Sequence, residues 1–179
     1  MKECQVGMKE IGDRYEAGKY FVSELMYAGE IMKDIMKELG PLLRGGEEAE
    51  TSRGKVVLGT VKGDVHNLGK DVVALMLRGA GFEVIDLGVD VPAARFVSAA
   101  VELHADVIGM SALVSTTMDG QREVIELLRE QGLADTYFTI VGGAPVSQQW
   151  ADEIGADGYG RNAASAVRTL DDWLQASGH

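Results

Sequence analysis

Residues 55–70 read Lys-Val-Val-Leu-Gly-Thr-Val-Lys-Gly-Asp-Val-His-Asn-Leu-Gly-Lys, and this stretch is the strongest indication of the fold. The apolar run over 55–61 has the length and the β-branched content of a buried strand. The loop after it holds Asp64, His66 and Gly69 in the spacing Asp-x-His-x-x-Gly. In an open parallel sheet, ligands bind outside the carboxyl ends of the strands, where this loop would lie. We therefore expect a ligand site around this loop.

A histidine that follows a carboxylate by two residues suits metal ligation. A neutral imidazole is a good ligand for a transition metal. A carboxylate that binds the other ring nitrogen fixes the tautomer and raises the basicity of the ligating nitrogen. An isolated histidine is more often an ordinary loop residue, but His66 occurs together with Asp64, Gly69 and further polar and glycine-rich loops. His66 is therefore our candidate metal ligand.

From Lys55 onward, short apolar runs alternate with helical periods. We predict strands at 55–61, 82–87, 106–111, 136–141 and 156–159, and helices at 69–79, 92–103, 118–131, 147–154 and 162–175. Such alternation implies a parallel sheet with helices on both faces, because crossover connections are right-handed. The expected fold class is α/β, a flavodoxin-like (Rossmann-like) five-stranded parallel sheet of order 2-1-3-4-5.

The residues before the sheet predict a short helical cap over 1–43, joined by the linker 44–54 to a domain over 55–179. Apolar residues recur with helical spacing at Phe21, Leu25, Ala28, Met32, Ile35 and Leu39. We expect an earlier helix to end near Gly18 and Pro41 to stop the second helix. Two such helices bury little surface alone, so they must pack on the following domain or on another chain.

Composition narrows the classes of function. The chain has 179 residues and a net charge of −11, which argues against nucleic acid as a partner. It has no run of 18 or more apolar residues, so we expect no membrane span. The amino terminus lacks the basic-then-apolar layout of a signal peptide, and the single cysteine, Cys4, cannot form an internal disulfide. These features favour the cytoplasm.

The loops after the other strands supply hydroxyl groups and small residues. They contain Ser111, Leu113, Ser115, Thr116 and Thr117 after the third strand, Gly142 and Gly143 after the fourth, and Gly158, Tyr159 and Gly160 after the fifth. Small residues at this edge leave a groove instead of a filled surface. The hydroxyl residues after the third strand have a second interpretation as turn and helix-start residues, because serine and threonine favour such positions.

The region 55–175 resembles the cobalamin-binding domain of corrinoid methyl-transfer proteins. The matching signatures are Asp64-x-His66-x-x-Gly69, Ser111-x-Leu113 and Gly142-Gly143. The segment 11–43 resembles the end of the helical cap of corrinoid subunits in methylamine- and methanol-type methyltransferase systems and of methionine synthase. The family usually has Asp at the position of Asn67, and its cap has about four helices where this sequence shows two.

The resemblance implies that the protein binds cobalamin or a related corrinoid, as methylcobalamin and cob(I)alamin, with the tail base displaced from cobalt by His66. Asp64 then holds the other ring nitrogen, and Thr117 extends this relay. The implied cofactor-binding residues are Asp64, Val65, His66, Asn67, Leu68, Gly69, Ser111, Leu113, Ser115, Thr116, Thr117, Gly142, Gly143 and Met26. Met26, Tyr27, Met32 and Met36 are candidates for shielding the corrin, although a methionine stripe at helical spacing is more often plain core.

The implied function is that of a methyl carrier between a substrate:corrinoid methyltransferase and a second methyltransferase. A reductive activase and a second copy of the chain, bound through the cap, are further expected partners. The alternatives are a subunit of a carbon-skeleton mutase, which shares the Asp-x-His-x-x-Gly element, a cobalamin-dependent sensor, and a receiver-like module without a corrinoid. No basic segment supports a sensor, and the acidic cluster and lysine typical of receivers are not evident.

Overall fold

The computed structural model describes residues 2–43 and 52–177, so most of the predicted linker 44–54 lies outside the described residues. Within the described residues the strands form one parallel sheet of order β2-β1-β3-β4-β5, which confirms the predicted fold class and topology. The strands are β1 (Lys55–Thr60), β2 (Glu83–Asp86), β3 (Val107–Ser111), β4 (Phe138–Gly142) and β5 (Gly158–Gly160). Each lies within two residues of the predicted bounds.

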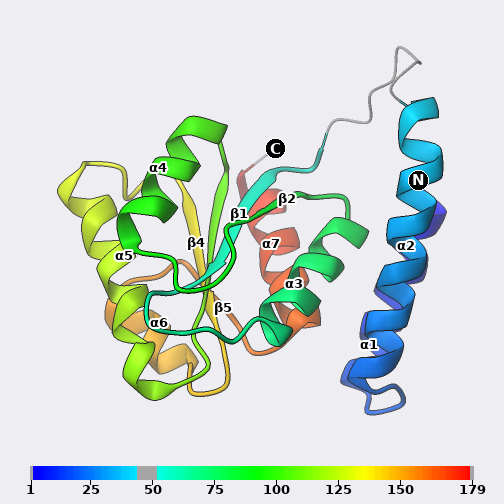
Figure 1. Ribbon diagram of the computed structural model, residues 1–179, viewed down its shortest axis with the longest axis horizontal. Helices are drawn as coiled ribbons and strands as arrows, with labels where there is room; N and C mark the ends of the chain where they lie inside the picture. The colour runs from blue at the N-terminus through cyan, green and yellow to red at the C-terminus, as the bar shows by residue number, and fades with distance from the viewer. Residues whose placement is uncertain (1, 44–51, 178–179) are drawn as a thin grey trace.

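Helices cover both faces of this sheet (Figure 1). They are α1 (Lys2–Glu16), α2 (Val22–Leu43), α3 (Leu68–Gly79), α4 (Ala93–Leu103), α5 (Asp119–Glu130), α6 (Gln148–Ile154) and α7 (Ala163–Ser177), with a 3₁₀ turn η1 (Ser115–Thr117). One apolar core lies between the sheet and α4, α5 and α6, and a second lies between the sheet and α3 and α7. Among the described residues, we find no helix with the length and hydropathy needed to cross a bilayer.

The prediction that Pro41 stops the second helix is wrong, because α2 continues to Leu43. Proline removes one N–H donor and disturbs the carbonyl one turn earlier, which costs most in a helix interior. Pro41 lies in the last turn of α2, where the helix is about to end in any case. The first helix ends as predicted, at Glu16, and the chain then turns through Gly18 with φ +69°.

The helices α1 and α2 pack against the outer side of α3 and α7, as Figure 1 shows. Their contact is a third apolar cluster, formed by Met8, Leu25, Met32, Val72, Met76, Ala163 and Ala164. Met32 is only 7% exposed in this cluster, so it is a core residue of the cap. Arg168 of α7 donates to both carboxylate oxygens of Glu16 at the end of α1. The expectation that the two helices pack on the following domain is therefore confirmed.

Close approach of the cap to α3 depends on glycine. A Cβ added at Gly29 of α2 would lie 1.7 Å from Cδ2 of Leu75 on α3. A Cβ added at Gly12 of α1 would lie 2.7 Å from Cε of Met76. Glycine at these two positions lets α1 and α2 approach α3 more closely than a larger residue would allow.

We predict that Gly29→Ala lowers the free energy of unfolding by about 1–3 kcal/mol, because the whole Leu75 side chain must move. The matched control is Gly7→Ala on α1, where an added Cβ meets nothing within 4 Å. Alanine there should be neutral or stabilise by up to about 1 kcal/mol through its better helix propensity. Urea unfolding of both variants measures the difference, and an equal response at the two positions would contradict the close packing.

Candidate functional site

The His66 loop is held in one conformation by the carboxylate of Asp64. Oδ1 of Asp64 lies 2.7 Å from Nδ1 of His66 and accepts the backbone N–H of the same residue at 3.0 Å. A carboxylate partner places the proton on Nδ1, so Nε2 keeps its lone pair. The imidazole is 51% exposed. His66 therefore presents an oriented, half-exposed ring nitrogen at the carboxyl edge of the sheet, which suits metal ligation.

The second carboxylate oxygen of Asp64 binds the loop after β3. It accepts the backbone N–H of Leu113 at 2.6 Å and of Val114 at 3.3 Å, and the hydroxyl of Thr117 at 2.9 Å. Asp64 is 1% exposed, and burial alone raises the pKa of a carboxyl group. The hydrogen bonds from His66, Leu113 and Thr117 outweigh burial, so the pKa of Asp64 lies well below its ordinary value. Asp64 is therefore a buried, ionised acceptor.

Two further residues support the loop, and the sequence pattern did not reveal them. The hydroxyl of Thr60, at the end of β1, donates to the carbonyl of His66 at 2.9 Å. Asp90 accepts the N–H of Gly63 at 2.7 Å and donates its own N–H to the carbonyl of Asp64 at 2.9 Å. The only sign of this role in the sequence is that Asp90 follows a predicted strand. In the structure it lies in a turn, where its φ is +54°.

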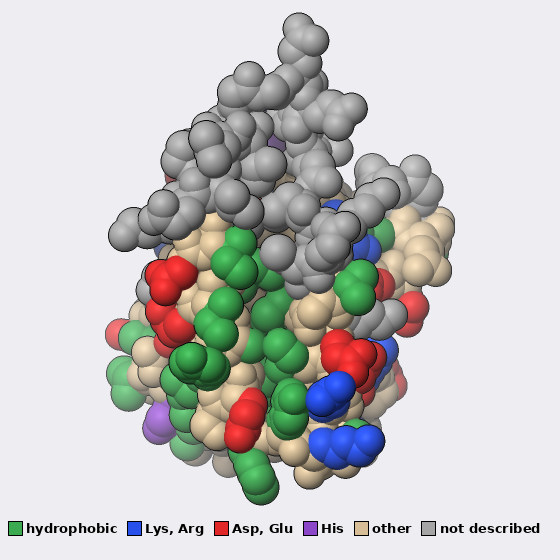
Figure 2. Space-filling view, turned by 90° about the vertical axis from the view of Figure 1, so that its right-hand side faces the viewer, with side chains coloured by type: hydrophobic (Ala, Val, Ile, Leu, Met, Phe, Trp, Pro, Cys, Tyr) green, Lys and Arg blue, Asp and Glu red, His purple; other side chains and the backbone are tan. Residues whose placement is uncertain are grey.

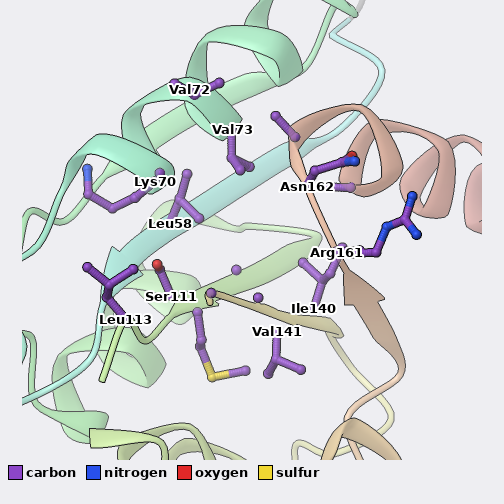
Figure 3. Close-up of a pocket in the computed structure, with 18 of the residues that line it drawn as sticks. Leu58, Lys70, Val72, Val73, Ser111, Leu113, Ile140, Val141, Arg161 and Asn162 are labelled. Carbon is purple, nitrogen blue, oxygen red and sulfur yellow. The ribbon is translucent and has the colours of Figure 1, made fainter. Parts of the chain in front are cut away.

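A cavity of about 660 Å³ opens beside His66 and extends between the sheet and the helices α3 and α7 (Figure 3). The predicted site residues that line it are Val65, His66, Asn67, Leu68, Gly69, Ser111, Leu113, Gly142 and Gly143. Asp64 and Thr117 do not line the cavity: Asp64 binds the imidazole of His66, and the Thr117 hydroxyl donates to the other oxygen of Asp64. Ser115 and Thr116 are exposed on η1 and Met26 is 44% exposed on α2, and none of the three lines the cavity. Their cofactor-binding role stays a prediction, and the side chain of Met36 lies outside the described residues.

The cavity has walls that the sequence did not predict. Tyr15 and Val22, on either side of the turn between α1 and α2, bring the cap to its rim. Arg161 and Asn162 line it at the start of α7. Lys70, directly after Gly69, is 3% exposed and donates to Asp71 at 2.6 Å and to Asp86 at 2.5 Å, which ties the start of α3 to the end of β2.

The glycines at the carboxyl edge of the sheet differ in what a larger side chain would meet. A Cβ at Gly143, where φ is +126°, would lie 1.8 Å from the carbonyl oxygen of Ala112. A Cβ at Gly142 would lie 2.8 Å from the carbonyl oxygen of Gly160. The packing of the protein itself thus requires these two glycines. At Gly69 an added Cβ meets nothing within 4 Å, so the open space beside it suits a bound group.

The surroundings of His66 fit a flat apolar group that brings its own metal. Large apolar side chains are exposed in the His66 loop, at the start of α3 and in the loop that Asp64 binds after β3, namely Val65, Leu68, Leu113 and Val114. Exposed large apolar side chains gathered around one site mark a binding surface. No group of three or more His, Cys, Asp or Glu able to hold a metal ion occurs among the described residues. A single imidazole suits an axial position on a metal already held by a macrocycle, as in a corrin.

We predict a pH dependence from Asp64. Its pKa is depressed in the folded state, so its charge contributes stability above the unfolded pKa of about 3.9 that is lost as the pH falls toward the folded pKa. The protein without cofactor should therefore lose stability below about pH 4. Asp64→Asn should cost about 2 kcal/mol or more at pH 7 and weaken this acid dependence.

Urea unfolding from pH 7 to pH 2.5 provides the measurement. Asp119→Asn is the control, because the Asp119 carboxylate is 80% exposed and lies 3.7 Å from its partner Arg122. If the two variants showed the same pH dependence, the buried hydrogen bonds of Asp64 would not be the source of the acid sensitivity.

The chain matches known protein families along most of its length. A family model described as a B12 binding domain matches residues 54–168, and a second model with the same description matches residues 1–39. Dimethylamine corrinoid protein 3 of Methanosarcina mazei is 50% identical over 167 residues, which cover 93% of this chain and 99% of that protein. A corrinoid protein of Desulfitobacterium hafniense is 47% identical over 90% of this chain and 75% of its own length.

Solved structures give the same result. A cobalamin-binding protein from Desulfitobacterium hafniense superposes with a TM-score of 0.80 at 36% identity, covering 94% of this chain and 78% of that one. The methanol:cobalamin methyltransferase complex MtaBC from Methanosarcina barkeri gives 0.83 at 30% identity, covering 96% and 65%. A response regulator from Staphylococcus aureus, at 14% identity and a TM-score of 0.50, shares the fold alone. The match of both segments to B12-binding models, together with relatives of this similarity, shows that the chain belongs to the B12-binding family of corrinoid proteins.

Proposed function

We propose that this protein carries a methyl group between two methyltransferases on the cobalt of a bound corrinoid, with His66 as the lower axial ligand. The observation that carries the proposal is the fixed imidazole at the mouth of the cavity, with Nδ1 bound to Asp64 at 2.7 Å and Nε2 left with its lone pair. When bound, the corrinoid supplies the cobalt that accepts and releases the methyl group.

The residues of the chain orient and tune this ligand. Asp64 holds the proton at Nδ1 of His66, which keeps Nε2 basic and directed away from the carboxylate. The Thr117 hydroxyl and the backbone N–H of Leu113 keep Asp64 ionised in a buried position. A bound corrinoid would cover exposed apolar side chains such as Val65, and this contact would exclude water from the neighbourhood of the imidazole. The cavity beside Gly69 would take the tail of the corrinoid.

The names of the relatives support the assignment of partners. Relatives are named dimethylamine corrinoid proteins, and MtaBC is a complex with a methanol:cobalamin methyltransferase. The first partner of this chain is accordingly a methyltransferase that uses a methylated amine or a related small methyl donor. The second partner is the methyltransferase that passes the methyl group to its acceptor. A third partner is a reductive activase, which reduces the cofactor back to its active form. The protein acts in the cytoplasm. The same names favour a methyl carrier over the mutase and sensor alternatives.

We predict that His66→Gly leaves the corrinoid bound, because the tail cavity is intact, but changes its absorption spectrum, because the axial nitrogen is lost. His104→Gly is the control, since His104 ends α4 with φ +50°, a conformation that glycine adopts readily. Absorption spectra of the two loaded variants provide the measurement. A His66→Gly spectrum identical to that of the wild type would refute axial ligation.

The outer side of the cap supports a second copy of the chain as a partner. Apolar side chains run down this face (Figure 2). Apart from Val22 at the rim of the cavity, the large apolar side chains exposed on α2 or just before it are Phe21, Met26, Tyr27 and Ile31. An exposed apolar face of this kind favours contact with another protein surface, and a second copy of the chain presents the same face.

We expect sedimentation equilibrium to show a dimer for the wild type. The double variant Tyr27→Glu, Ile31→Glu should be monomeric, because it places charges on the proposed interface. Val101→Glu is the control, since Val101 is 47% exposed on α4, on the far side of the sheet from the cap. A monomeric wild type would contradict the pairing of caps.

A further inference from the structure

The imidazole of His66 is directed by hydrogen bonding more than by packing. It is 51% exposed, and its Nδ1 lies 2.7 Å from Oδ1 of Asp64. A half-exposed ring has free space on one side, so neighbouring side chains do not fix its direction. The direction of Nε2 therefore depends on where the backbone of the loop places Asp64 and His66.

The loop between β2 and α4 runs along the beginning of the His66 loop. The N–H of Thr60 donates to the carbonyl of Gly88 at 3.0 Å, and the N–H of Val91 donates to the carbonyl of Thr60 at 3.0 Å. Val61 and Val91 form a parallel bridge. The pairing of β1 with β2 thus continues past the ends of both strands, to the point where the His66 loop begins.

The loop between β2 and α4 is itself fixed at its start. Oδ1 of Asp86 accepts the N–H of Gly88 at 2.8 Å, and Oδ2 of Asp86 accepts a hydrogen bond from Nζ of Lys70 at 2.5 Å. Lys70 is 3% exposed, and an ammonium group at this burial needs an anionic partner. The loop is therefore a firm support for the residues that it contacts.

Asp90 is the residue of this loop that binds the turn before His66. Its carboxylate accepts the N–H of Gly63 at 2.7 Å, and its own N–H donates to the carbonyl of Asp64 at 2.9 Å. Asp64 is therefore held from two sides. The loop after β3 binds its carboxylate, and Asp90 binds its backbone.

Aspartate at position 90 has a conformational cost that glycine would avoid. The φ of Asp90 is +54°, in the left-handed region, which aspartate tolerates and glycine adopts freely. Gly88, two residues earlier, has φ +88°, and an added Cβ there meets nothing within 4 Å. A side chain kept at a left-handed position, with its carboxylate bound to the neighbouring turn, indicates a role for that carboxylate.

We propose that Asp90 is a positioning residue for the axial ligand, which holds the turn at Gly63 and Asp64 so that Nε2 of His66 points toward the metal of a bound corrinoid. This rests on the proposed ligation by His66. Asp90 does not line the cavity, so it acts through the backbone of the turn. The net contribution of one such hydrogen bond corresponds to about a three- to ten-fold change in affinity.

Asp90→Gly and Asp90→Asn are a matched pair of variants. Glycine and asparagine both adopt a left-handed φ, but only asparagine keeps an oxygen that can accept the N–H of Gly63. The full chain without cofactor is titrated with hydroxocobalamin, and absorbance gives the dissociation constant. We expect Asp90→Gly to bind about three- to ten-fold more weakly than the wild type and Asp90→Asn to bind equally well. Undiminished affinity of Asp90→Gly overturns the proposal.

His104→Gly is the control for this pair. Asp90 and His104 are the two non-glycine residues with positive φ among the described residues, and His104 precedes β3, at the opposite edge of the sheet. Loss of its side chain should leave the dissociation constant unchanged. A loss of affinity equal to that of Asp90→Gly would show a general effect of such substitutions and contradict a role of Asp90 in positioning.

A double-mutant cycle separates positioning from a general effect on the fold. In the His66→Gly background no imidazole remains to be positioned, so Asp90→Gly should change the affinity for hydroxocobalamin by less than about two-fold. An equal loss in both backgrounds overturns the proposal. If the wild type does not bind, or if its spectrum matches that of His66→Gly, the proposed function itself fails. If those two spectra differ and Asp90→Gly binds as the wild type does, only the role of Asp90 fails.

Hydrogen exchange in the protein without cofactor tests the contact independently of the corrinoid. The N–H of Gly63 should exchange at least about three-fold faster in Asp90→Gly than in Asp90→Asn, because only asparagine offers it an acceptor. Equal exchange rates in the two variants would show that the side chain at position 90 does not hold the turn.

Discussion

The site depends on one buried carboxylate. Asp64 joins the loop after β1 to the loop after β3, and it does so by accepting hydrogen bonds from His66, Leu113 and Thr117. An ionised group at 1% exposure is tolerated only because donors surround both of its oxygens. The same contacts fix the tautomer and the direction of the imidazole. The hydrogen bonds of Asp64 therefore set both the orientation of the His66 imidazole and the structure of the two loops.

Strand order explains why this network exists. β1 and β3 are neighbours in the sheet although an entire strand and two helices separate them in sequence. Their carboxyl ends consequently meet, and the chain leaves β1 toward one face of the sheet and β3 toward the other. A crevice forms where neighbouring connections diverge in this way, and the cavity beside His66 lies there. Gly142 and Gly143 let the end of β4 pack closely against its neighbours at the same edge.

The cap, formed by α1 and α2, also contacts the edge of the sheet that carries the site. It docks on α3 and α7 through small residues such as Gly29, and the turn between its two helices places Tyr15 and Val22 at the rim of the cavity. The ion pair between Glu16 and Arg168 lies at that end of α1 and holds the pKa of Glu16 below its ordinary value. Cap and domain thus meet at the edge where the ligand enters. If the cap moved away from this edge, contacts at the end of α1 such as the Glu16–Arg168 ion pair would break.

The sequence by itself determined the elements and the central motif. Apolar periodicity placed every strand and sheet-covering helix within a few residues, and the spacing of Asp64 and His66 identified the loop that carries the candidate ligand. These signals are local, so a single sequence contains them. Tertiary structure alone decided which distant residues complete the site. Thr60, Asp90 and Lys70 act through contacts that no periodic pattern encodes, and the position of the cap brought Tyr15 to the cavity while leaving Met26 off its wall. Such contacts arise from strand order and helix packing, which bring together residues that lie far apart along the chain.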